Sequence, residues 1–288
     1  MLNSLRDLIA SGTPLIAPSI YDGISAAALR DAGFSAAYIG SYATGATKYA
    51  VPDIGYIGVE DMADQVRRLS PIADVPLIVD GEGGWGNPLH VARSIKLLEQ
   101  AGAAAIHIED HDFGKHIVES PRIIPTEQAV DKIKAAVDAR DSEDLMIIAR
   151  TDAAGTEGPQ AAFDRLMAYQ EAGADGLFYA GVPDSAIQLR LKDESRVPIF
   201  GVDFPGQSAA ELGKLTDVIL YYGLTHLVVR NALSRAFSVL SAEGSAVSLE
   251  EELGGIPGII GFDDFLGVPQ AREKAEQFGL IDEKDTNE

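Results

Sequence analysis

Polar side chains that could do chemistry stand at the ends of several short apolar runs in the sequence. These ends read Gly40-Ser41-Tyr42, Asp80-Gly81-Glu82, Glu109-Asp110, Arg150-Thr151-Asp152 and Arg230-Asn231. If the runs are parallel strands of one barrel, their carboxyl ends meet at one face, which is where barrel enzymes carry their catalytic groups. The sequence therefore predicts one polar site built from neighbouring strands.

The acidic side chains of Asp80, Glu82 and Glu109 would converge in such a site. Carboxylates brought together repel one another unless they share a proton or a cation. A cluster of hard oxygen donors suits Mg²⁺ or Mn²⁺, often through bound water. The glycines of GEGGWG at 81–86 would let the backbone approach a ligand closely. The alternative is that these acids cap helices or form salt bridges in loops.

Arg150 follows an apolar run and would stand at the buried end of a strand. An arginine in that place needs an anion, and its planar guanidinium suits a substrate carboxylate or phosphate. The alternative is a structural ion pair with Asp152 or with an acid of the cluster. Residue types alone leave both interpretations open.

The stretch at 111–125 has no strand or helix pattern, and loops of this length in a barrel often serve as lids. Lys115 and His116 lie in it and would close over a substrate, unless they are simply solvated loop charges. Two other histidines, His90 on a predicted helix and His107 inside a predicted strand, are interpreted as structural.

Apolar, β-rich runs alternate with amphipathic stretches along the chain. The runs lie at 14–20, 36–41, 76–82, 105–110, 145–150, 176–181, 198–203 and 226–231. Continuous apolar runs are typical of parallel strands covered on both faces. Their alternation with helices predicts a (β/α)8 TIM barrel. A doubly wound sheet is the alternative, but GEGGWG does not match the G-x-G-x-x-G fingerprint of dinucleotide-binding sheets.

The remaining segments are predicted to be mostly helical. Residues 87–102 and 126–139 have helical spacing, and 217–223 is interpreted as the end of a helix rather than a strand. No linker-like tract divides the chain, so residues 1–288 are predicted to form a single barrel domain. Within it, 240–288 would be a C-terminal helical extension, interrupted by an irregular connector at 254–265.

Composition excludes several classes of function. The 288 residues include 23 Lys and Arg, 44 Asp and Glu, and no cysteine, for a net charge of −21. Without cysteine there is no disulfide, no cysteine-ligated metal centre and no cysteine nucleophile. The acidic surplus disfavours nucleic acid as a partner. No apolar run is long enough to span a membrane, and the first residues lack a signal-peptide pattern, so we expect a cytoplasmic protein.

The segment PLIVDGEGGWGNPLHVARSIKLLEQAGAAAIHIED at 76–110 resembles the isocitrate lyase/phosphoenolpyruvate mutase superfamily. IIARTDA at 147–153 and AYQEAGADGLF at 168–178 add to this resemblance, which extends over residues 5–240. The metal motif of that family, D-x-D-x-G-[YF]-G, corresponds to DGEGGWG at 80–86, with Glu82 replacing the second acid and Trp85 the aromatic residue.

The resemblance implies a role for each matching residue. The metal, Mg²⁺ or Mn²⁺, would be bound by Asp80, Glu82, Glu109 and a water-bridged Asp53. The substrate, a small anionic carboxylate, would be bound by Arg150, Tyr38, Gly40, Ser41, Tyr42 and Asn231. Members of the family break or form a C–C or P–C bond next to a 2-oxo acid or its enolate. The metal and Arg150 would stabilise the enolate charge.

The family also implies an assembly. Its members commonly exchange the last helix between the subunits of a dimer or a dimer of dimers. A homodimer or homotetramer is therefore expected, with residues 240–288 used in oligomerisation.

Two departures from the family pattern indicate the subgroup. Its lyases carry K-[KR]-C-G-H in the lid with cysteine as the presumed acid/base, whereas this chain reads Lys115-His116-Ile117-Val118-Glu119. The mutase pattern E-D-K-x-x-x-K-x-[NT]-S is also incomplete. On the sixth strand, Ala180 stands where lyases have glutamate and mutases histidine. These features resemble the oxaloacetate decarboxylase branch, which has a histidine at the last-strand position assigned here to Asn231.

We therefore predict a metal-dependent carbon–carbon lyase, in the first place a decarboxylase of oxaloacetate or a related acid. Loss of CO₂ gives a metal-bound enolate that any proton source can quench. Catalytic candidates are Arg150, Lys115, Glu82 and His116. A methylisocitrate lyase-like enzyme is the second interpretation and would need a base such as Glu82, His116 or Tyr42. A P–C bond enzyme and a non-catalytic binding barrel are further alternatives.

Overall fold

The computed structural model describes residues 4–112, 117, 122–181, 184–203 and 206–281. These residues form two compact units, Met1–Leu227 and Val228–Glu288. Each unit is described separately below.

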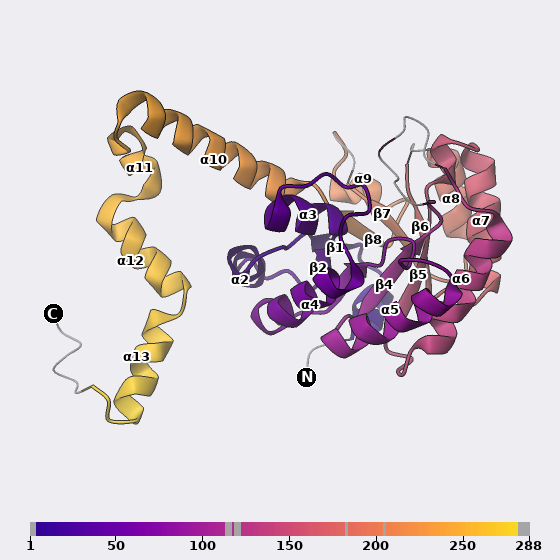
Figure 1. Cartoon of the computed structure of the whole chain (residues 1–288), viewed down its shortest axis with the longest axis horizontal. Helices are drawn as coiled ribbons and strands as arrows, with labels where there is room; N and C mark the ends of the chain where they lie inside the picture. The colour runs from indigo at the N-terminus through magenta and orange to yellow at the C-terminus, as the bar shows by residue number, and fades with distance from the viewer. Residues whose placement is uncertain (1–3, 113–116, 118–121, 182–183, 204–205, 282–288) are drawn as a thin grey trace. The chain divides into compact units, whose positions relative to one another are not determined.

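The first unit is a parallel barrel of eight strands (Figure 1). The strands are β1 Leu15–Pro18, β2 Ala37–Ile39, β3 Leu77–Asp80, β4 Ala105–Glu109, β5 Met146–Thr151, β6 Gly176–Tyr179, β7 Ile199–Val202 and β8 Val218–Tyr221. They are hydrogen-bonded in the order β1-β8-β7-β6-β5-β4-β3-β2. The ring closes where Ser19 pairs with Tyr38 and the N–H of Ile20 donates to the carbonyl of Tyr38 over 2.9 Å. The predicted (β/α)8 barrel is confirmed.

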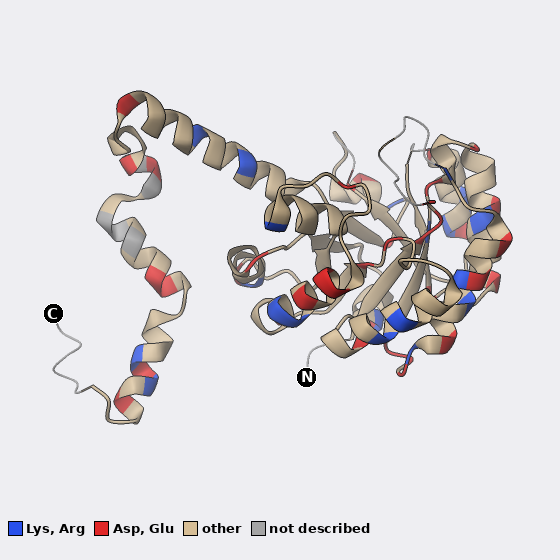
Figure 2. Cartoon of the chain, in the orientation of Figure 1, with Lys and Arg blue, Asp and Glu red and all other residues tan. Residues whose placement is uncertain are grey.

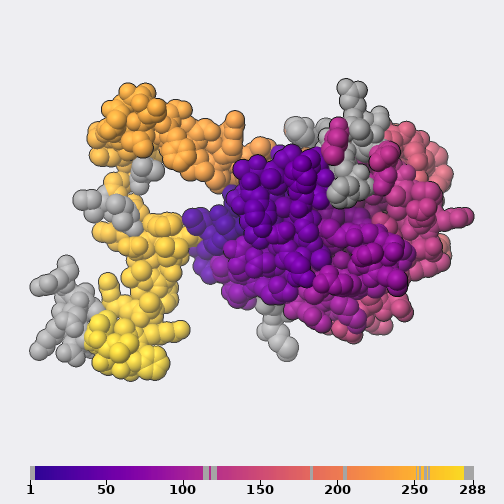
Figure 3. Space-filling view, in the orientation of Figure 1, coloured from indigo at the N-terminus to yellow at the C-terminus, as the bar shows by residue number. Residues whose placement is uncertain are grey.

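Helices alternate with the strands and surround them. In this unit they are α1 Leu5–Ala10, α2 Gly23–Asp31, α3 Ser41–Tyr49, α4 Val59–Ala73, α5 Pro88–Ala101, α6 Thr126–Ala139, the 3-10 turn η2 Ala153–Gly155, α7 Pro159–Glu171, α8 Ser185–Glu194 and α9 Ala209–Leu212. On the face seen in Figure 3, their side chains cover the strands. The predicted helices at 87–102 and 126–139 are confirmed as α5 and α6.

The two sides of each strand pack against different partners, because successive side chains of a strand point in opposite directions. In β4, Ile106 and Ile108 lie in the layer between strands and helices, whereas Ala105 lies in the barrel interior. The interior is packed mainly by apolar side chains, including Tyr38, Ile78, Ile148, Phe178, Phe200 and Leu5 of α1. This two-residue period also decides where the charged side chains at the strand ends point.

Charged residues are concentrated on the helices and loops (Figure 2). Within the strands, the charged residues are Asp80, Glu109 and Arg150. Each lies at or near the carboxyl end of its strand and two residues beyond an inward-facing position, so each turns into the barrel mouth. The strands thus deliver one basic and two acidic side chains to one place.

The eighth strand differs from the prediction. Residues 218–221 form β8, which pairs with β1 and β7, and 226–231 lies in the helix α10 Leu224–Glu243. The expected strand at 226–231 and the expected helix end at 217–223 are therefore both wrong. Val228 and Val229 favour a strand locally, but they fall in a stretch of twenty residues without Gly or Pro that continues as a helix. Residues 218–221 form the strand because they pair with both β1 and β7, and the local strand propensity of a segment does not decide which one forms β8.

The second unit is helical. It contains most of α10, the 3-10 turn η3 Val247–Leu249, α11 Glu250–Leu253, α12 Gly255–Phe265 and α13 Val268–Gln277. The irregular connector expected at 254–265 is wrong, because α12 occupies it and begins after Gly254 in the left-handed region with φ 75°. None of the helices in the described ranges is long and apolar enough to cross a membrane.

Candidate functional site

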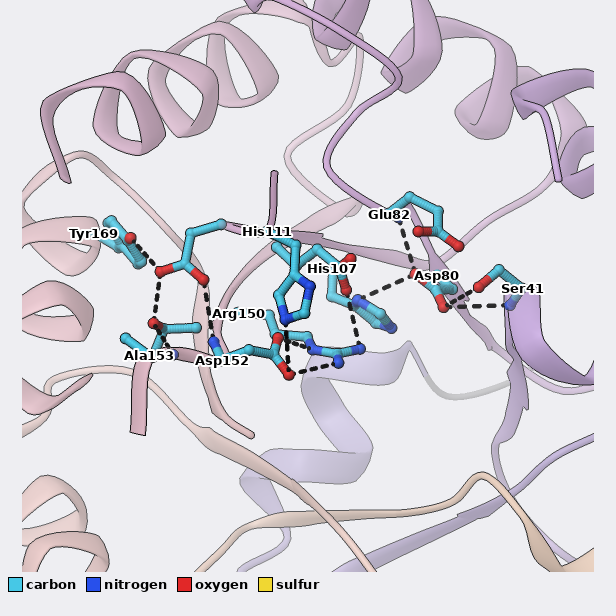
Figure 4. Close-up of polar contacts among 12 residues, drawn as sticks. Ser41, Asp80, Glu82, His107, His111, Arg150, Asp152, Ala153 and Tyr169 are labelled. Carbon is cyan, nitrogen blue, oxygen red and sulfur yellow. Dashed lines mark hydrogen bonds and ion pairs between the residues drawn. The ribbon is translucent and has the colours of Figure 1, made fainter. Parts of the chain in front are cut away.

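Three neighbouring strands bring charged side chains together at the mouth of the barrel. Asp80 of β3, Glu109 of β4 and Arg150 of β5 come from strands that pair directly in this order. Figure 4 shows Asp80 beside Ser41 and Glu82, while Arg150 lies with Asp152 and His111. The predicted polar centre is therefore built, with an acidic side at β3 and a basic side at β5.

Asp80 is buried and held by several donors. One carboxylate oxygen accepts hydrogen bonds from the backbone N–H of Ser41 over 3.2 Å and from its hydroxyl over 2.9 Å. The other oxygen accepts from the N–H of Glu82 over 2.9 Å. Donors of this kind favour the ionised form of a carboxyl group. The N–H of Ser41, expected to bind substrate, is thus directed at Asp80 in this structure.

The turn after β3 presents Glu82 in a strained conformation. Glu82 has φ 47° and Trp85 has φ 57°, in the left-handed region that costs a non-glycine residue about 1–3 kcal/mol. Gly81 cannot be replaced without movement, because a Cβ there would lie 2.6 Å from the backbone oxygen of His107. The carbonyl of Glu82 accepts from the N–H of Glu109 over 2.9 Å, which links the ends of β3 and β4. Backbone strain of this kind clusters at functional sites.

Arg150 is nearly buried and engages two carboxylates. Its Nε and Nη2 donate to the two oxygens of Asp152 over 2.8 and 2.9 Å, and its Nη1 lies 3.2 Å from Glu109. The guanidinium also lies over the ring of Phe178, 5.2 Å from its centroid. Burial alone would lower the pKa of Arg150, but Asp152 and Glu109 outweigh it and raise the pKa above its ordinary value. The structural ion pair considered from the sequence is therefore present.

Asp110 supports this pair from behind. It accepts hydrogen bonds from the Thr151 hydroxyl over 2.6 Å, the N–H of Asp152 over 3.1 Å and the Tyr169 hydroxyl over 2.8 Å. Burial raises the pKa of Asp110 in spite of these donors. By fixing Thr151 and Asp152, Asp110 fixes the end of β5 and with it the carboxylate that orients Arg150.

Tyr38 and His107 lie beneath the acidic side of the site. The Tyr38 hydroxyl is 3.1 Å from Nε2 of His107 and 3.5 Å from Asp80, and His107 Nδ1 is 3.6 Å from Asp80. Both side chains are almost completely buried. Burial, and then the charge of Asp80, raise the pKa of Tyr38 well above its ordinary value. In this structure Tyr38, expected to bind substrate, contacts Asp80.

The first turn of α10, shortly after β8, brings to the barrel mouth an imidazole to which the sequence assigned no role. His226 in α10 is 7% exposed, and its ring stands edge-on to Tyr42 with the centroids 4.8 Å apart. Neither ring nitrogen has a hydrogen-bond partner among the described residues. Burial lowers the pKa of His226 below its ordinary value, which favours the neutral ring. Tyr42 itself remains partly exposed at the mouth.

Three predicted site residues lie outside the described part of the first unit. Lys115 and His116 lie outside the described residues. Asn231 was selected by its place on a last strand, but it lies in α10, in the part that belongs to the second unit. The expected place of Asn231 on the last strand is therefore wrong, because that strand is β8 at 218–221.

Two residues near the site carried little signal in the sequence. His111, directly after Glu109-Asp110, is buried with Nε2 3.6 Å from Asp152. Lys132 of α6 resembles any solvated lysine of an amphipathic helix, yet it faces a cavity of about 630 Å³ that Glu82, Glu109 and His111 also line. The position of His111 directly after a predicted strand end could have indicated it. Lys132 is revealed only by the packing of α6.

The donors at the mouth fit a hard divalent cation. Asp80, Glu82 and Glu109 offer buried carboxylates. In addition to burial, the charge of Asp53, like those of Asp80 and Glu109, acts on Tyr38 and raises its pKa. In the described part of the chain, no three His, Asp or Glu side chains are grouped closely enough to hold a metal by themselves. Mg²⁺ usually takes one or two protein carboxylates and completes its shell with water and substrate oxygens. The donor set fits an ion bound in that way.

Comparison with known proteins shows the family to which the chain belongs. A family profile described as phosphoenolpyruvate phosphomutase matches residues 5–239. The 2-methylisocitrate lyase of Salmonella typhimurium is 34% identical over 251 residues, covering 84% of this chain and 85% of that protein. The oxaloacetate decarboxylase of Rhodopseudomonas palustris is 36% identical over 242 residues, covering 81% and 82%.

A solved structure agrees with these relatives. The crystal structure of phosphonopyruvate hydrolase in complex with oxalate and Mg²⁺ is 26% identical, with a TM-score of 0.84 over 96% of this chain and 98% of that one. These three similar proteins are named as a lyase, a decarboxylase and a hydrolase.

The Arg150–Asp152 pair predicts a pH-dependent stability. The guanidinium outweighs burial and holds the pKa of Asp152 well below its ordinary value. The stabilisation is therefore complete above about pH 4, the unfolded pKa of aspartate, and is lost as pH falls toward the folded pKa. We expect Asp152→Asn to cost about 3–5 kcal/mol at pH 7. That difference from the wild type should shrink by about 1 kcal/mol at pH 3.

Urea unfolding at both pH values measures this difference in proteins that also carry His111→Gln, because Asp152, against the effect of burial, raises the pKa of His111 as well. Titrating groups that do not contact Asp152 then cancel between the two proteins. Asp193→Asn, an exposed acid of α8, is the control and should change stability by about 0.5 kcal/mol or less. A cost for Asp152→Asn that is equal at the two pH values would contradict the assignment.

Proposed function

The chain belongs to the phosphoenolpyruvate phosphomutase family and is a carbon–carbon lyase of small carboxylic acids. Within this class, we propose that it is a metal-dependent decarboxylase of oxaloacetate or a closely related 2-oxo diacid. One observation carries the proposal. The charged side chains of the described strands converge at the mouth of the barrel: Asp80, Glu109 and Arg150. Carboxylates that could bind a metal ion there lie beside a guanidinium that could bind a substrate carboxylate.

Arg150 is the group that would bind the substrate carboxylate. A guanidinium has five N–H donors, and its contacts with Asp152 and Glu109 leave donors for a further anion. Asp152 orients the fork and Phe178 lies against its face, so the side chain is held before substrate arrives. Preorganised charge of this kind stabilises a developing enolate and its carboxylate without reorganisation during the reaction.

The acidic side of the site would hold Mg²⁺ or Mn²⁺ through Asp80, Glu82 and Glu109, with Asp53 acting through water. When bound there, a divalent cation supplies Lewis-acid polarisation of the 2-oxo group. The N–H and hydroxyl of Ser41 and the N–H of Glu82 hold the Asp80 carboxylate in its orientation. Gly40 and Tyr42, next to Ser41, are proposed to contact the substrate at the start of α3.

The sixth and eighth strands favour decarboxylation over cleavage of a 2-hydroxy acid. Ala180 is buried beyond β6 and offers neither the acid nor the base that a hydroxyl substrate would need at this position. Decarboxylation requires no such group, because water can protonate the enolate. The decarboxylase branch has a histidine on its last strand. With β8 at 218–221, His226 replaces Asn231 as the residue to compare with that histidine.

A screen of pyruvate release tests the reaction. The purified protein is incubated with oxaloacetate or 2-methylisocitrate, with Mg²⁺, with Mn²⁺ and with a chelator. We expect metal-dependent release from oxaloacetate well above the rate without protein, and loss of that excess on chelation.

Background rates with both acids would sink the proposal, and a preference for 2-methylisocitrate would indicate the lyase instead. Phosphorus NMR after incubation with phosphonopyruvate detects the P–C alternative. Tight binding of Mg²⁺ and oxalate without turnover would indicate a non-catalytic barrel.

Substitution of Arg150 tests its role. Arg150→Lys keeps the positive charge but loses the planar fork, and Arg150→Ala loses both. Steady-state kinetics should show a loss in kcat/KM worth more than about 2 kcal/mol, or about thirtyfold, for Arg150→Ala. A smaller loss is expected for Arg150→Lys. Arg30→Ala, an exposed residue of α2, is the control. An effect of Arg150→Ala within threefold would remove it from the site.

We also propose that the C-terminal helices mediate a homodimer or homotetramer. Large apolar side chains are exposed along α10 at three- and four-residue spacing, namely Val229, Leu233, Phe237 and Leu240. An apolar stripe of this kind on a single chain marks a surface for a partner. The resemblance makes a second copy of the chain the expected partner.

Light scattering after size-exclusion chromatography tests the assembly. The wild type should have a mass that is a multiple of the chain mass. Phe237→Glu should shift the mass toward that of one chain, because it places a charge on the stripe. Leu189→Glu, at an exposed leucine of α8, should leave it unchanged. A monomeric wild type would refute the proposal.

A further inference from the structure

Lys132 reaches from α6 to the turn that carries Glu82. Its ammonium donates a hydrogen bond to the carbonyl of Gly83 over 2.8 Å. The two residues are 49 positions apart in the chain, so this contact joins α6 to the connection between β3 and α5. It is therefore a tertiary contact at the middle of the turn, immediately after Glu82.

The turn needs such contacts because its backbone is strained. Glu82 and Trp85 both occupy the left-handed region, and a strained backbone persists only where its surroundings determine it. The N–H of Gly84 donates to the carbonyl of Gly81 within the turn, and the indole N–H of Trp85 donates to the carbonyl of Ile57. Lys132 adds a charge-assisted hydrogen bond, which is stronger than a neutral one.

The ammonium also faces carboxylates. Asp112, Glu109 and Asp110 act on it electrostatically, and it lines the same cavity as Glu82 and Glu109. A lysine acting only through its charge would compete with a bound cation, so its removal would help the site. A lysine that holds the turn would have the opposite effect, because Glu82 would lose its place. The two roles therefore differ in sign.

We propose that Lys132 is a positioning residue, which fixes the 81–86 turn through the Gly83 carbonyl and so presents Glu82 to the site. The proposal rests on the proposed function in one respect, since Glu82 is taken there as a carboxylate of the reaction centre. Lys132 acts through the backbone and touches no substrate. Loosening the turn moves Glu82 but leaves Arg150 in place, so turnover falls more than substrate binding.

Trp85 makes the turn directly observable. It is the single tryptophan of the chain and is half-buried, so the intrinsic fluorescence of the protein reports on this turn. Acrylamide quenching is measured on full-length wild type, Lys132→Met, Lys132→Arg and Lys134→Met. Lys134 is an exposed lysine two residues further along the same helix and serves as the matched control.

We expect Lys132→Met to raise the quenching constant about twofold, because the turn opens locally. Lys132→Arg, which can still donate to a carbonyl, and Lys134→Met should match the wild type. In kinetics with the best substrate of the pyruvate screen, kcat of Lys132→Met should fall about tenfold or more with KM within threefold. Lys132→Arg should restore kcat. Circular dichroism confirms that each variant is folded, and Lys132→Gln, too short to reach Gly83, replaces Lys132→Met if that variant unfolds.

Unchanged quenching in folded Lys132→Met would overturn the proposal, as would raised quenching with kcat within threefold of the wild type. A higher kcat would assign Lys132 a purely electrostatic role and overturn it as well. If the wild type turns over no acid in the screen, the proposed function fails by itself. The quenching measurement then still decides whether Lys132 holds the turn.

Discussion

A buried positive charge dominates the centre of this barrel. The guanidinium of Arg150 stands 16% exposed at the end of β5, and a charge in that place is tolerated only when anions compensate it. Asp152 and Glu109 supply them, and Asp110 holds Asp152 through the backbone and Thr151. The carboxyl ends of β4 and β5 are therefore organised around one cation, which a substrate carboxylate would share.

On the acidic side of the mouth, a buried carboxylate needs hydrogen-bond donors. Asp80 is buried and accepts hydrogen bonds from Ser41, which follows β2, and from the N–H of Glu82. The carbonyl of Glu82 accepts from the N–H of Glu109 in β4, so the ends of β2, β3 and β4 are tied into one polar layer. The strained turn at 81–86 is held between this layer and α6. A lysine on one side and an arginine on the other flank carboxylates that suit a divalent cation. A chain with a net charge of −21 can in this way present a local centre for a small anion.

Most of the barrel could be predicted from the sequence because buried parallel strands leave continuous apolar runs. Seven strands lie where those runs indicated, and Asp80, Glu109 and Arg150 lie at or next to the ends of three of them. The eighth strand could not be located in this way. Residues 218–221 and 226–231 both have the composition of a strand, and only hydrogen bonding to β1 and β7 separates them. Because β8 lies at 218–221, the residue that follows the eighth strand closely is His226 and not Asn231.

The sequence by itself determined the family, the fold class and the strand ends that carry charge, because these depend on local pattern and on motifs of adjacent residues. The absence of cysteine and the Ile117 in the cysteine position of the lyase motif were equally visible there. The sequence offered the Arg150–Asp152 pair as one of two alternatives, and the structure decided between them. Tertiary structure alone decided the long-range contacts. It brought Arg150 to Glu109, turned Tyr38 toward Asp80, and brought Lys132 to Gly83 across 49 positions. Such contacts depend on how strands and helices pack in a closed barrel, and no local pattern in the sequence encodes them.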